Sequence, residues 1–183
     1  MKHIGTRYIE TERLILRRFE LSDAQAMFDN WASDGEVTKY LTWPTHSDVS
    51  VTRRILMEWV PQYAKDDCYR WAIVLKENGS QPIGSIDVVR WYENGESPEI
   101  GYCMGKRWWH RGIMTEALGA VIDFLFDQVE LQRIEARHDT NNPHSGGVMR
   151  KCGMTFAGVR ERSLQNNQGV VDTAQYFIER GDR

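Results

Sequence analysis

The amino-acid sequence predicts a mixed α/β fold, in which helices flank a central, mostly antiparallel sheet that contains one parallel crossover. Two hairpin-like pairs of strands, one around Asn78-Gly79 and one across residues 155–179, supply the antiparallel part. Between them, residues 98–138 have the pattern of strand, helix and strand, which makes a right-handed crossover between two parallel strands. Antiparallel strands combined with one crossover are typical of the mixed α/β class.

The first strand and the first helix are predicted from the N-terminal part of the chain. Residues 11–19 are strand-like, with Leu14 and Leu16 on the same face. Residues 22–25 have the spacing of a capping box, in which a serine and a glutamine three residues later bond the free N–H groups of a helix start. We therefore expect a helix from residue 23 to about residue 31.

Two more helical segments are predicted before the first hairpin. Residues 34–41 form a short helical turn, which Thr42-Trp43-Pro44 interrupts. Ser47 or Asp48 can cap a longer helix, which Pro61 should kink or end. Aromatic residues are dense here, and they either pack helices onto the sheet or line a substrate-side wall: Trp31, Tyr40, Trp43, Trp59 and Tyr63.

The second half of the chain alternates strands and helices. Residues 69–76 and 83–91 are the strands of the first hairpin, and Asn94-Gly95 turns the chain into the crossover. After the crossover, a short helix is expected at about 145–152, and Gly153 can cap its end.

Length and composition predict one cytoplasmic domain across residues 1–183. Of the 183 residues, 41% are hydrophobic and 27% are charged, which suits a single domain with a sizeable core. A net charge of −3 and a pI near 6.0 argue against a general nucleic-acid binder. The sequence has no run of about 18 apolar residues and no signal-type apolar stretch near Met1, so no membrane partner is expected.

The cysteines argue against a disulfide framework and against a metal site. Cys68, Cys103 and Cys152 are odd in number and unrelated in spacing, which predicts free thiols in a reducing compartment. The sequence leaves a homodimer open.

A basic loop joins the strand at 98–104, in which Ile100, Tyr102 and Met104 share one face, to the helix that begins near Ile113. That helix has an apolar stripe along one side, from Met114 to Phe126. The loop carries Lys106, Arg107, His110, Arg111 and Gly112. The first turn of a helix has unpaired N–H groups at the positive end of the helix dipole, so this order is typical of a phosphate site. The same order also occurs in α/β proteins that bind no phosphate, and neither Gly-x-Gly-x-x-Gly nor Gly-Lys-Ser/Thr is present.

Three segments, taken together, carry a resemblance to a known family. They are residues 11–17 (Thr-Glu-Arg-Leu-Ile-Leu-Arg), residues 99–102 (Glu-Ile-Gly-Tyr) followed by 111–117, and residues 142–154. The chain resembles the GNAT superfamily of acyl-CoA-dependent N-acetyltransferases over nearly its whole length. It is most similar to the Rim-type branch (RimJ and RimL), which acetylates the N-termini of ribosomal proteins. The resemblance implies a GNAT-like fold, a single N-acetyltransferase domain and acetyl-CoA as co-substrate.

The resemblance also implies which residues meet acetyl-CoA. Its pyrophosphate is expected on the basic loop and its pantetheine arm along the preceding strand end, with two more residues approaching from the next strand. The expected contacts are Cys103, Met104, Trp109, His110, Arg111, Gly112, Ile113, Met114, Thr115, Asn142 and Ser145. The superfamily loop usually reads Gln or Arg, two residues, Gly, one residue, and Gly or Ala, so Trp109 and Met114 depart from it.

Two catalytic roles follow from the resemblance and from the chemistry of acetyl transfer. Ser145 either protonates the leaving thiolate or caps the helix that follows Pro143. The family often has a glutamate where this chain has Ala157, so Glu99 is the first candidate for the general base and Asp87 the second. The alternative for these carboxylates is pairing with an arginine, namely Arg17, Arg90 or Arg137.

The function expected from the sequence is acetyl-CoA-dependent N-acetyl transfer. The acetyl group would move directly to a primary amine, of which a protein N-terminus is one example. Two other functions remain open. One is acetylation of a small amine such as a polyamine, an antibiotic or an amino acid, and the other is non-catalytic binding of acyl-CoA by a regulator.

Overall fold

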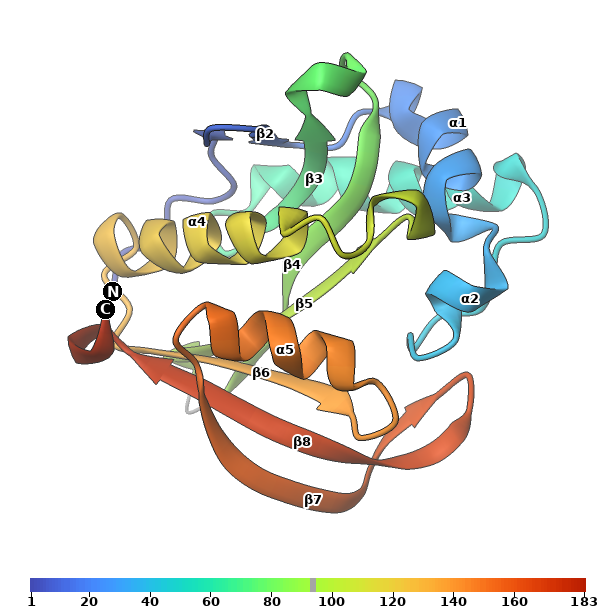
Figure 1. The fold of residues 1–183 in the computed structure, drawn as a ribbon. Coiled ribbons are helices and arrows are strands. Elements are labelled where there is room, and N and C mark those ends of the chain that lie inside the picture. Colours follow the sequence, from blue (N-terminus) through green and yellow to red (C-terminus); the bar gives the residue numbers. More distant parts are fainter. Residues whose placement is uncertain (93–94) are drawn as a thin grey trace.

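The computed structural model describes residues 1–92 and 95–183, and across these residues the strands form one eight-stranded sheet. The strand order is β1-β2-β3-β4-β5-β6-β8-β7 (Figure 1). The bounds are β1 Ile9–Glu10, β2 Leu14–Arg17, β3 Arg70–Leu75, β4 Pro82–Tyr92, β5 Ser97–Met104, β6 Arg133–Asp139, β7 Thr155–Asn166 and β8 Gly169–Glu179. Neighbouring strands are antiparallel except β5 and β6, so the predicted mixed fold with one parallel crossover is confirmed.

Helices lie on both faces of this sheet (Figure 1). The bounds are α1 Ala24–Met27, α2 Gly35–Thr38, α3 Val49–Trp59, α4 Ile113–Asp127 and α5 Pro143–Lys151. The larger core cluster joins the sheet to α4 and α5, and the second joins it to α1 and α3 on the opposite face. We refer to these as the α4 face and the α1 face.

The apolar patterns in the sequence correctly predict the core of the α4 face. Leu14 and Leu16 of β2 have exposed fractions of 0%, and the helical stripe that begins at Ile113 is buried along the length of α4. Because side chains alternate across a strand, Ile100 and Met104 of β5 also pack on the α4 face.

The start of the first helix differs from the prediction. The capping box is formed by Glu20 and Asp23, not by residues 22–25. The Asp23 carboxylate accepts a bond from the Glu20 N–H at 2.8 Å and two from the Arg17 guanidinium, also at 2.8 Å. The ion pair holds Asp23 against the preceding strand, so the first helical turn begins two residues early. After α1 the chain continues as a π-helical turn (Phe28–Ala32), so the predicted helical end near residue 31 is confirmed, although its last turn is π-helical.

Other local predictions are confirmed. Asp34 and Asp48 cap α2 and α3 by accepting N–H bonds at 2.8 Å, and α3 ends before a 3-10 turn that contains Pro61. The hairpin at Asn78-Gly79 joins β3 and β4, and Gly79 adopts a φ of 81°. The predicted turn at Asn94-Gly95 includes Asn94, which lies outside the described residues.

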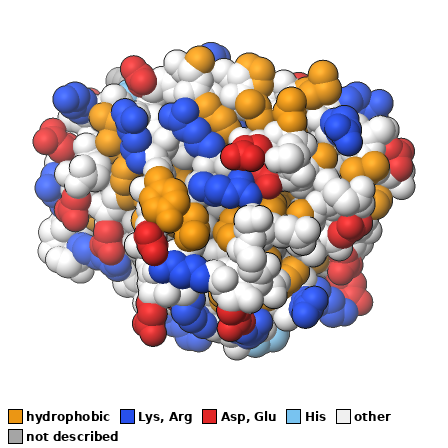
Figure 2. Space-filling model, turned by 90° about the horizontal axis from the view of Figure 1, so that it is seen from above, with side chains coloured by type: hydrophobic (Ala, Val, Ile, Leu, Met, Phe, Trp, Pro, Cys, Tyr) orange, Lys and Arg blue, Asp and Glu red, His pale blue; other side chains and the backbone are white. Residues whose placement is uncertain are grey.

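Among the described residues, no helix is both long and apolar enough to cross a membrane. Seen from above, the surface carries Lys and Arg side chains interspersed with Asp and Glu (Figure 2). Hydrophobic side chains lie between the charged ones on this face.

Candidate functional site

The sheet opens between β5 and β6, at the carboxyl ends of its two parallel strands. These strands pair only at Glu99 with Glu135 and at Ile100 with Ala136. Beyond that point β5 pairs with β4 alone, and β6 pairs with β8 alone. We call the resulting opening the wedge. Ligands of open α/β sheets bind outside the carboxyl ends of parallel strands, which makes the wedge a candidate binding site.

Main-chain groups of β5 face this wedge. Gly105 donates its N–H to the Ile83 carbonyl of β4 at 2.9 Å. Because bonded and non-bonded pairs alternate in antiparallel strands, Cys103 exchanges bonds with Ser85, whereas the N–H of Met104 points away from β4. The Met104 carbonyl accepts a bond from Trp109 Nε1 at 2.8 Å. Of the two predicted strand-end contacts, therefore, only Met104 directs its main chain to the wedge.

The N-terminus of α4 lies beside the wedge and offers free donors. Gly112 adopts a left-handed conformation with φ 71° and ψ 5°, and its carbonyl accepts the first helical bond, from Glu116, at 3.1 Å. The N–H groups of Ile113, Met114 and Thr115 therefore have no intrahelical acceptor. With the helix dipole, they form an electropositive turn suited to an anion.

The arginines of the basic loop are directed elsewhere. Arg111 donates to Glu77 at 2.7 Å, and the side chains of this pair are 45% and 64% exposed. The Arg107 guanidinium lies 5.6 Å from the centre of the Trp108 ring. The positive character of the anion site therefore comes mainly from main-chain groups.

The N-terminus of α5 lies on the other side of the wedge. Tyr102 of β5 donates its hydroxyl to the Ser145 carbonyl at 2.9 Å, so its side chain spans from one strand to the helix. The Asn142 amide donates to Ser145 Oγ at 3.1 Å. Ser145 lies within the first turn of α5, which begins at Pro143, so the predicted capping role for Ser145 is wrong. The ring centres of His110 and His144 are 5.0 Å apart, so the loop before α4 lies beside the start of α5.

The two candidate bases lie on the α1 face, and both are paired with arginine. Glu99 is 6% exposed, accepts a bond from Arg137 Nε at 3.0 Å, and accepts a short bond from the Tyr92 hydroxyl. Of the arginines weighed for this carboxylate from the sequence, Arg137 is therefore its partner.

Asp87 lies in β4 opposite Gly101, which has no side chain to cover it. Its carboxylate oxygen is 3.6 Å from Arg70 Nε, and both side chains are about four-fifths buried or more, at 17% and 16% exposure. Burial raises the pKa of Asp87 from 3.8 to about 6, although the Arg70 charge opposes the rise. A carboxylate with such a pKa can accept a proton near neutral pH.

Comparison with known proteins identifies the family. Residues 13–155 match the family described as "Acetyltransferase (GNAT) domain". The chain belongs to the GNAT acetyltransferase family. Its match with the uncharacterized N-acetyltransferase p20 of Bacillus licheniformis has 37% identity over 172 residues, covering 92% of this chain and 93% of the relative.

Solved structures share this GNAT fold. The ribosomal-protein-S5-alanine acetyltransferase of Vibrio fischeri superposes with a TM-score of 0.82 at 19% identity, covering 96% of this chain and 98% of that one. RimL, a ribosomal L7/L12 alpha-N-protein acetyltransferase solved with coenzyme A, superposes with a TM-score of 0.83 at 18% identity, covering 94% and 98%. GNAT acetyltransferases use acetyl-CoA, so the wedge and its free N–H groups fit the co-substrate of the family.

Three site features were missed at the sequence level. The sequence assigned Tyr102 only to a strand face and did not predict its bond to the Ser145 carbonyl. It also did not predict the bond from Asn142 to Ser145 Oγ, or the bond from the Arg13 guanidinium to the Arg111 carbonyl in the basic loop. These contacts join segments 43, 3 and 98 positions apart. Only the second is close enough in sequence for a local spacing rule to suggest it.

Proposed function

We propose that this protein moves an acetyl group from acetyl-CoA directly to a primary amine, and that a protein N-terminus is the acceptor. The wedge between β5 and β6, with the N-termini of α4 and α5 beside it, is the observation that carries the proposal. The acceptor class is supported by the two solved neighbours, which by name act on ribosomal proteins.

The donor is held mainly by main-chain groups in this proposal. Acetyl-CoA supplies an acetyl thioester, and its diphosphate is bound by the loop from Trp109 to Thr115. The free N–H groups at the start of α4 neutralise the phosphate charge, which explains why departures at Trp109 and Met114 are compatible with binding. The N–H of Met104 is available to the pantetheine arm or to the acetyl carbonyl.

Ser145 is the proposed general acid for the leaving thiolate. Its Oγ accepts the bond from Asn142, so the hydroxyl proton is not used in that contact and can be donated to sulfur. The thioester C–S bond breaks as the new C–N bond forms, the amine loses one proton, and the thiolate gains one. Tyr102 fixes the helix turn that carries Ser145.

Glu99 is the proposed general base, and Asp87 is the competing candidate. Both oxygens of Glu99 are engaged, one by Arg137 and the other by Tyr92, so a proton reaches it most directly through the Tyr92 hydroxyl. Burial raises the pKa of Asp87 to about 6, so this carboxylate can accept a proton near neutral pH. The two candidates predict different pH profiles, as described below.

The experiment that tests the function is acetyl transfer followed by mass spectrometry. Purified protein and acetyl-CoA are incubated with peptides that carry a free N-terminus, with the same peptides blocked at the N-terminus, and with polyamines and amino acids. We expect an added acetyl group on the free N-termini only. If only a small amine were acetylated, that amine and not a protein N-terminus would be the acceptor. If acetyl-CoA bound but no tested amine were acetylated, the protein would be a non-catalytic regulator.

A further inference from the structure

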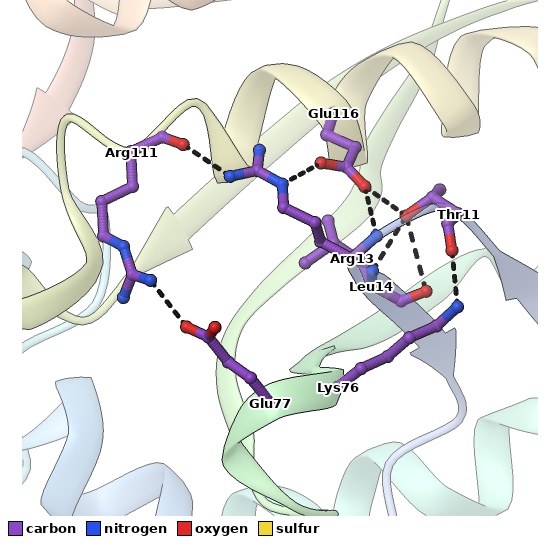
Figure 3. A network of polar contacts seen from close by, with 7 residues as sticks. All are labelled: Thr11, Arg13, Leu14, Lys76, Glu77, Arg111 and Glu116. Carbon is purple, nitrogen blue, oxygen red and sulfur yellow. Dashed lines mark hydrogen bonds and ion pairs between the residues drawn. The ribbon is translucent and has the colours of Figure 1, made fainter.

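A network of polar contacts connects the turn between β1 and β2 to the start of α4 (Figure 3). Glu116, in the first turn of α4, accepts three bonds: from Thr11 Oγ1 at 2.6 Å, from the Arg13 N–H at 2.9 Å and from Arg13 Nε at 2.6 Å. Arg13 also donates from Nη1 to the Arg111 carbonyl at 2.9 Å. One guanidinium thus bridges the helix and the loop before it.

The contact with Arg111 fixes the orientation of a peptide group at the anion site. The Arg111 carbonyl and the Gly112 N–H belong to the same trans peptide, in which the two groups point in opposite directions. Because Arg13 holds the carbonyl on its own side, the Gly112 N–H is directed to the other side of the loop. Arg13 Nη2 also lies 3.6 Å from the position that a Cβ on Gly112 would occupy, so the guanidinium lies beside this left-handed residue.

Charge provides a second reason for the contact between Arg13 and Glu116. A carboxylate in the first helical turn interacts favourably with the helix dipole, but it repels a phosphate bound at the same helix end. Partial burial raises the pKa of Glu116, but the bonds from Thr11 and Arg13 outweigh it, and the net pKa is lower than usual. Glu116 is therefore ionised at neutral pH, and the Arg13 charge offsets it beside the anion site.

We propose that Arg13 and Glu116 are positioning residues that preset the phosphate-binding loop, so that they govern affinity for the diphosphate of the donor and not the acetyl-transfer step. This inference rests on the proposed donor site. The network is also connected outward, because Lys76 donates to the Thr11 carbonyl at 2.7 Å and Arg111 pairs with Glu77. The β1–β2 turn, the β3–β4 connection and the loop therefore form one polar assembly (Figure 3).

A merely structural role predicts something different. If the network only attached the β1–β2 turn to α4, its removal would lower stability and would affect every acetyl donor alike. A positioning role affects only donors that carry a diphosphate. Acetyl-pantetheine has the same thioester but lacks the diphosphate, so it separates the two roles.

The experiment compares acetyl-CoA with acetyl-pantetheine in wild type, Arg13→Met and Glu116→Gln. For each variant, KM and kcat are measured with both donors, and folding is checked by circular dichroism. For Arg13→Met we expect KM for acetyl-CoA to rise about tenfold, the equivalent of one lost charge-assisted bond, with kcat unchanged. For Glu116→Gln we expect a smaller rise, because the loosened Arg13 is partly offset by the loss of a negative charge beside the phosphate. With acetyl-pantetheine, kcat/KM should stay within about twofold of wild type.

Two further variants keep the test decisive. Asp123→Asn removes a comparable ion pair with an arginine, Arg183, towards the other end of α4. It should change KM for neither donor. If Arg13→Met fails to fold, Arg13→Lys keeps the charge but cannot hold Glu116 and the Arg111 carbonyl in one planar fork, and a smaller rise in KM for acetyl-CoA is expected.

Unchanged KM for acetyl-CoA in folded variants, or equal losses with both donors, would overturn the positioning role. A different result would contradict the proposed donor site itself. If wild type had the same kcat/KM with acetyl-pantetheine as with acetyl-CoA, the diphosphate would not be bound by this loop.

Discussion

The two sides of the proposed reaction centre, which we call the donor side and the acceptor side, differ in how they are built. The donor side, at the start of α4, uses main-chain N–H groups in a loop fixed by Arg13 and Glu116. The acceptor side, on the α1 face, presents the carboxylates Glu99 and Asp87, each paired with an arginine. Main-chain donors depend on loop conformation, whereas side-chain carboxylates depend on their identity and on their partners.

This difference explains which departures from the family pattern the fold can absorb. Trp109 and Met114 alter side chains of the donor loop but leave its N–H groups at the start of α4 in place. The indole of Trp109 even gains a partner in the Met104 carbonyl. Ala157, by contrast, removes a carboxylate outright, and another group must act as the base if the proposed reaction occurs.

The largest effect is expected on the acceptor side, from Glu99→Gln. If Glu99 takes the proton of the amine, kcat should fall about a thousandfold at neutral pH and recover partly at high pH, where more of the amine is already neutral. The measurement is kcat against pH with a peptide acceptor. A normal rate across the pH range would remove Glu99 from the mechanism.

Asp87→Asn is the matched variant for that experiment. If Asp87 is the base instead, wild-type kcat/KM should rise with pH through about 6, and Asp87→Asn should abolish that rise. Loss of activity in only one of the two variants identifies the base, because each substitution keeps the side-chain shape and removes one carboxylate.

The next effect lies where the two sides meet, at Ser145. Ser145→Ala removes the hydroxyl that Asn142 orients, and kcat should fall about a hundredfold while the Kd of acetyl-CoA stays within about threefold. Stopped-flow turnover and calorimetry measure the two quantities. Full activity in the variant would show that the thiolate leaves without this proton.

The sequence predicted the elements that carry the proposed donor side better than the partners of the carboxylates on the proposed acceptor side, because the two depend on different ranges of interaction. The buried stripe of α4 and the alternation in β5 follow from periodicity within a short segment. The pairing of Glu99 with Arg137 joins residues 38 positions apart, and no local pattern distinguishes Arg137 from Arg17 or Arg90 as the partner.

Side-chain contacts between nearby residues account for the local errors. The motif at residues 22–25 has the right spacing for a capping box, but Asp23 is paired with Arg17 and the first helical turn begins at Leu21, with Glu20 as its N-cap. Likewise, Ser145 has the residue type of a helix cap, but Pro143 already begins the helix and Ser145 accepts a bond from Asn142 instead. Residue preference identified the helix starts correctly as regions, and the contacts of individual side chains determined at which residue each helix begins.

A smaller effect is expected on the donor side, from Gly112→Asp compared with Gly112→Asn. Asparagine tolerates the left-handed conformation, so it tests the added side chain alone, whereas aspartate adds a negative charge beside the phosphate site. We expect the Kd of acetyl-CoA to rise about thirtyfold for the aspartate and only a few-fold for the asparagine. Calorimetry at two salt concentrations measures both, and equal Kd values for the pair would contradict an anion site at this loop.

The smallest effect concerns the stability that each side contributes as pH changes. The pKa of Asp87 is raised in the folded protein, from 3.8 to about 6, so ionisation of Asp87 costs stability as pH rises through that window. The pKa of Glu116 is lowered, so its ionised form stabilises the fold above its ordinary value of 4.5, and that stability is lost as pH falls through the lower folded value.

The two neutral variants should therefore respond in opposite directions. Above pH 6, Asp87→Asn should be more stable than wild type by about 1 kcal/mol, a figure reduced for the partial exposure of the carboxylate, and Glu116→Gln should be less stable than wild type. Both differences should shrink as the pH falls towards 3, because protonation of each wild-type carboxyl removes the charge in which it differs from the variant. Urea denaturation of the three proteins between pH 3 and 8 measures the differences. If Asp87→Asn were the less stable protein at pH 8, the Arg70 pair would outweigh burial, and the Asp87 carboxylate would be a stabilising ion pair with no raised pKa to offer a base.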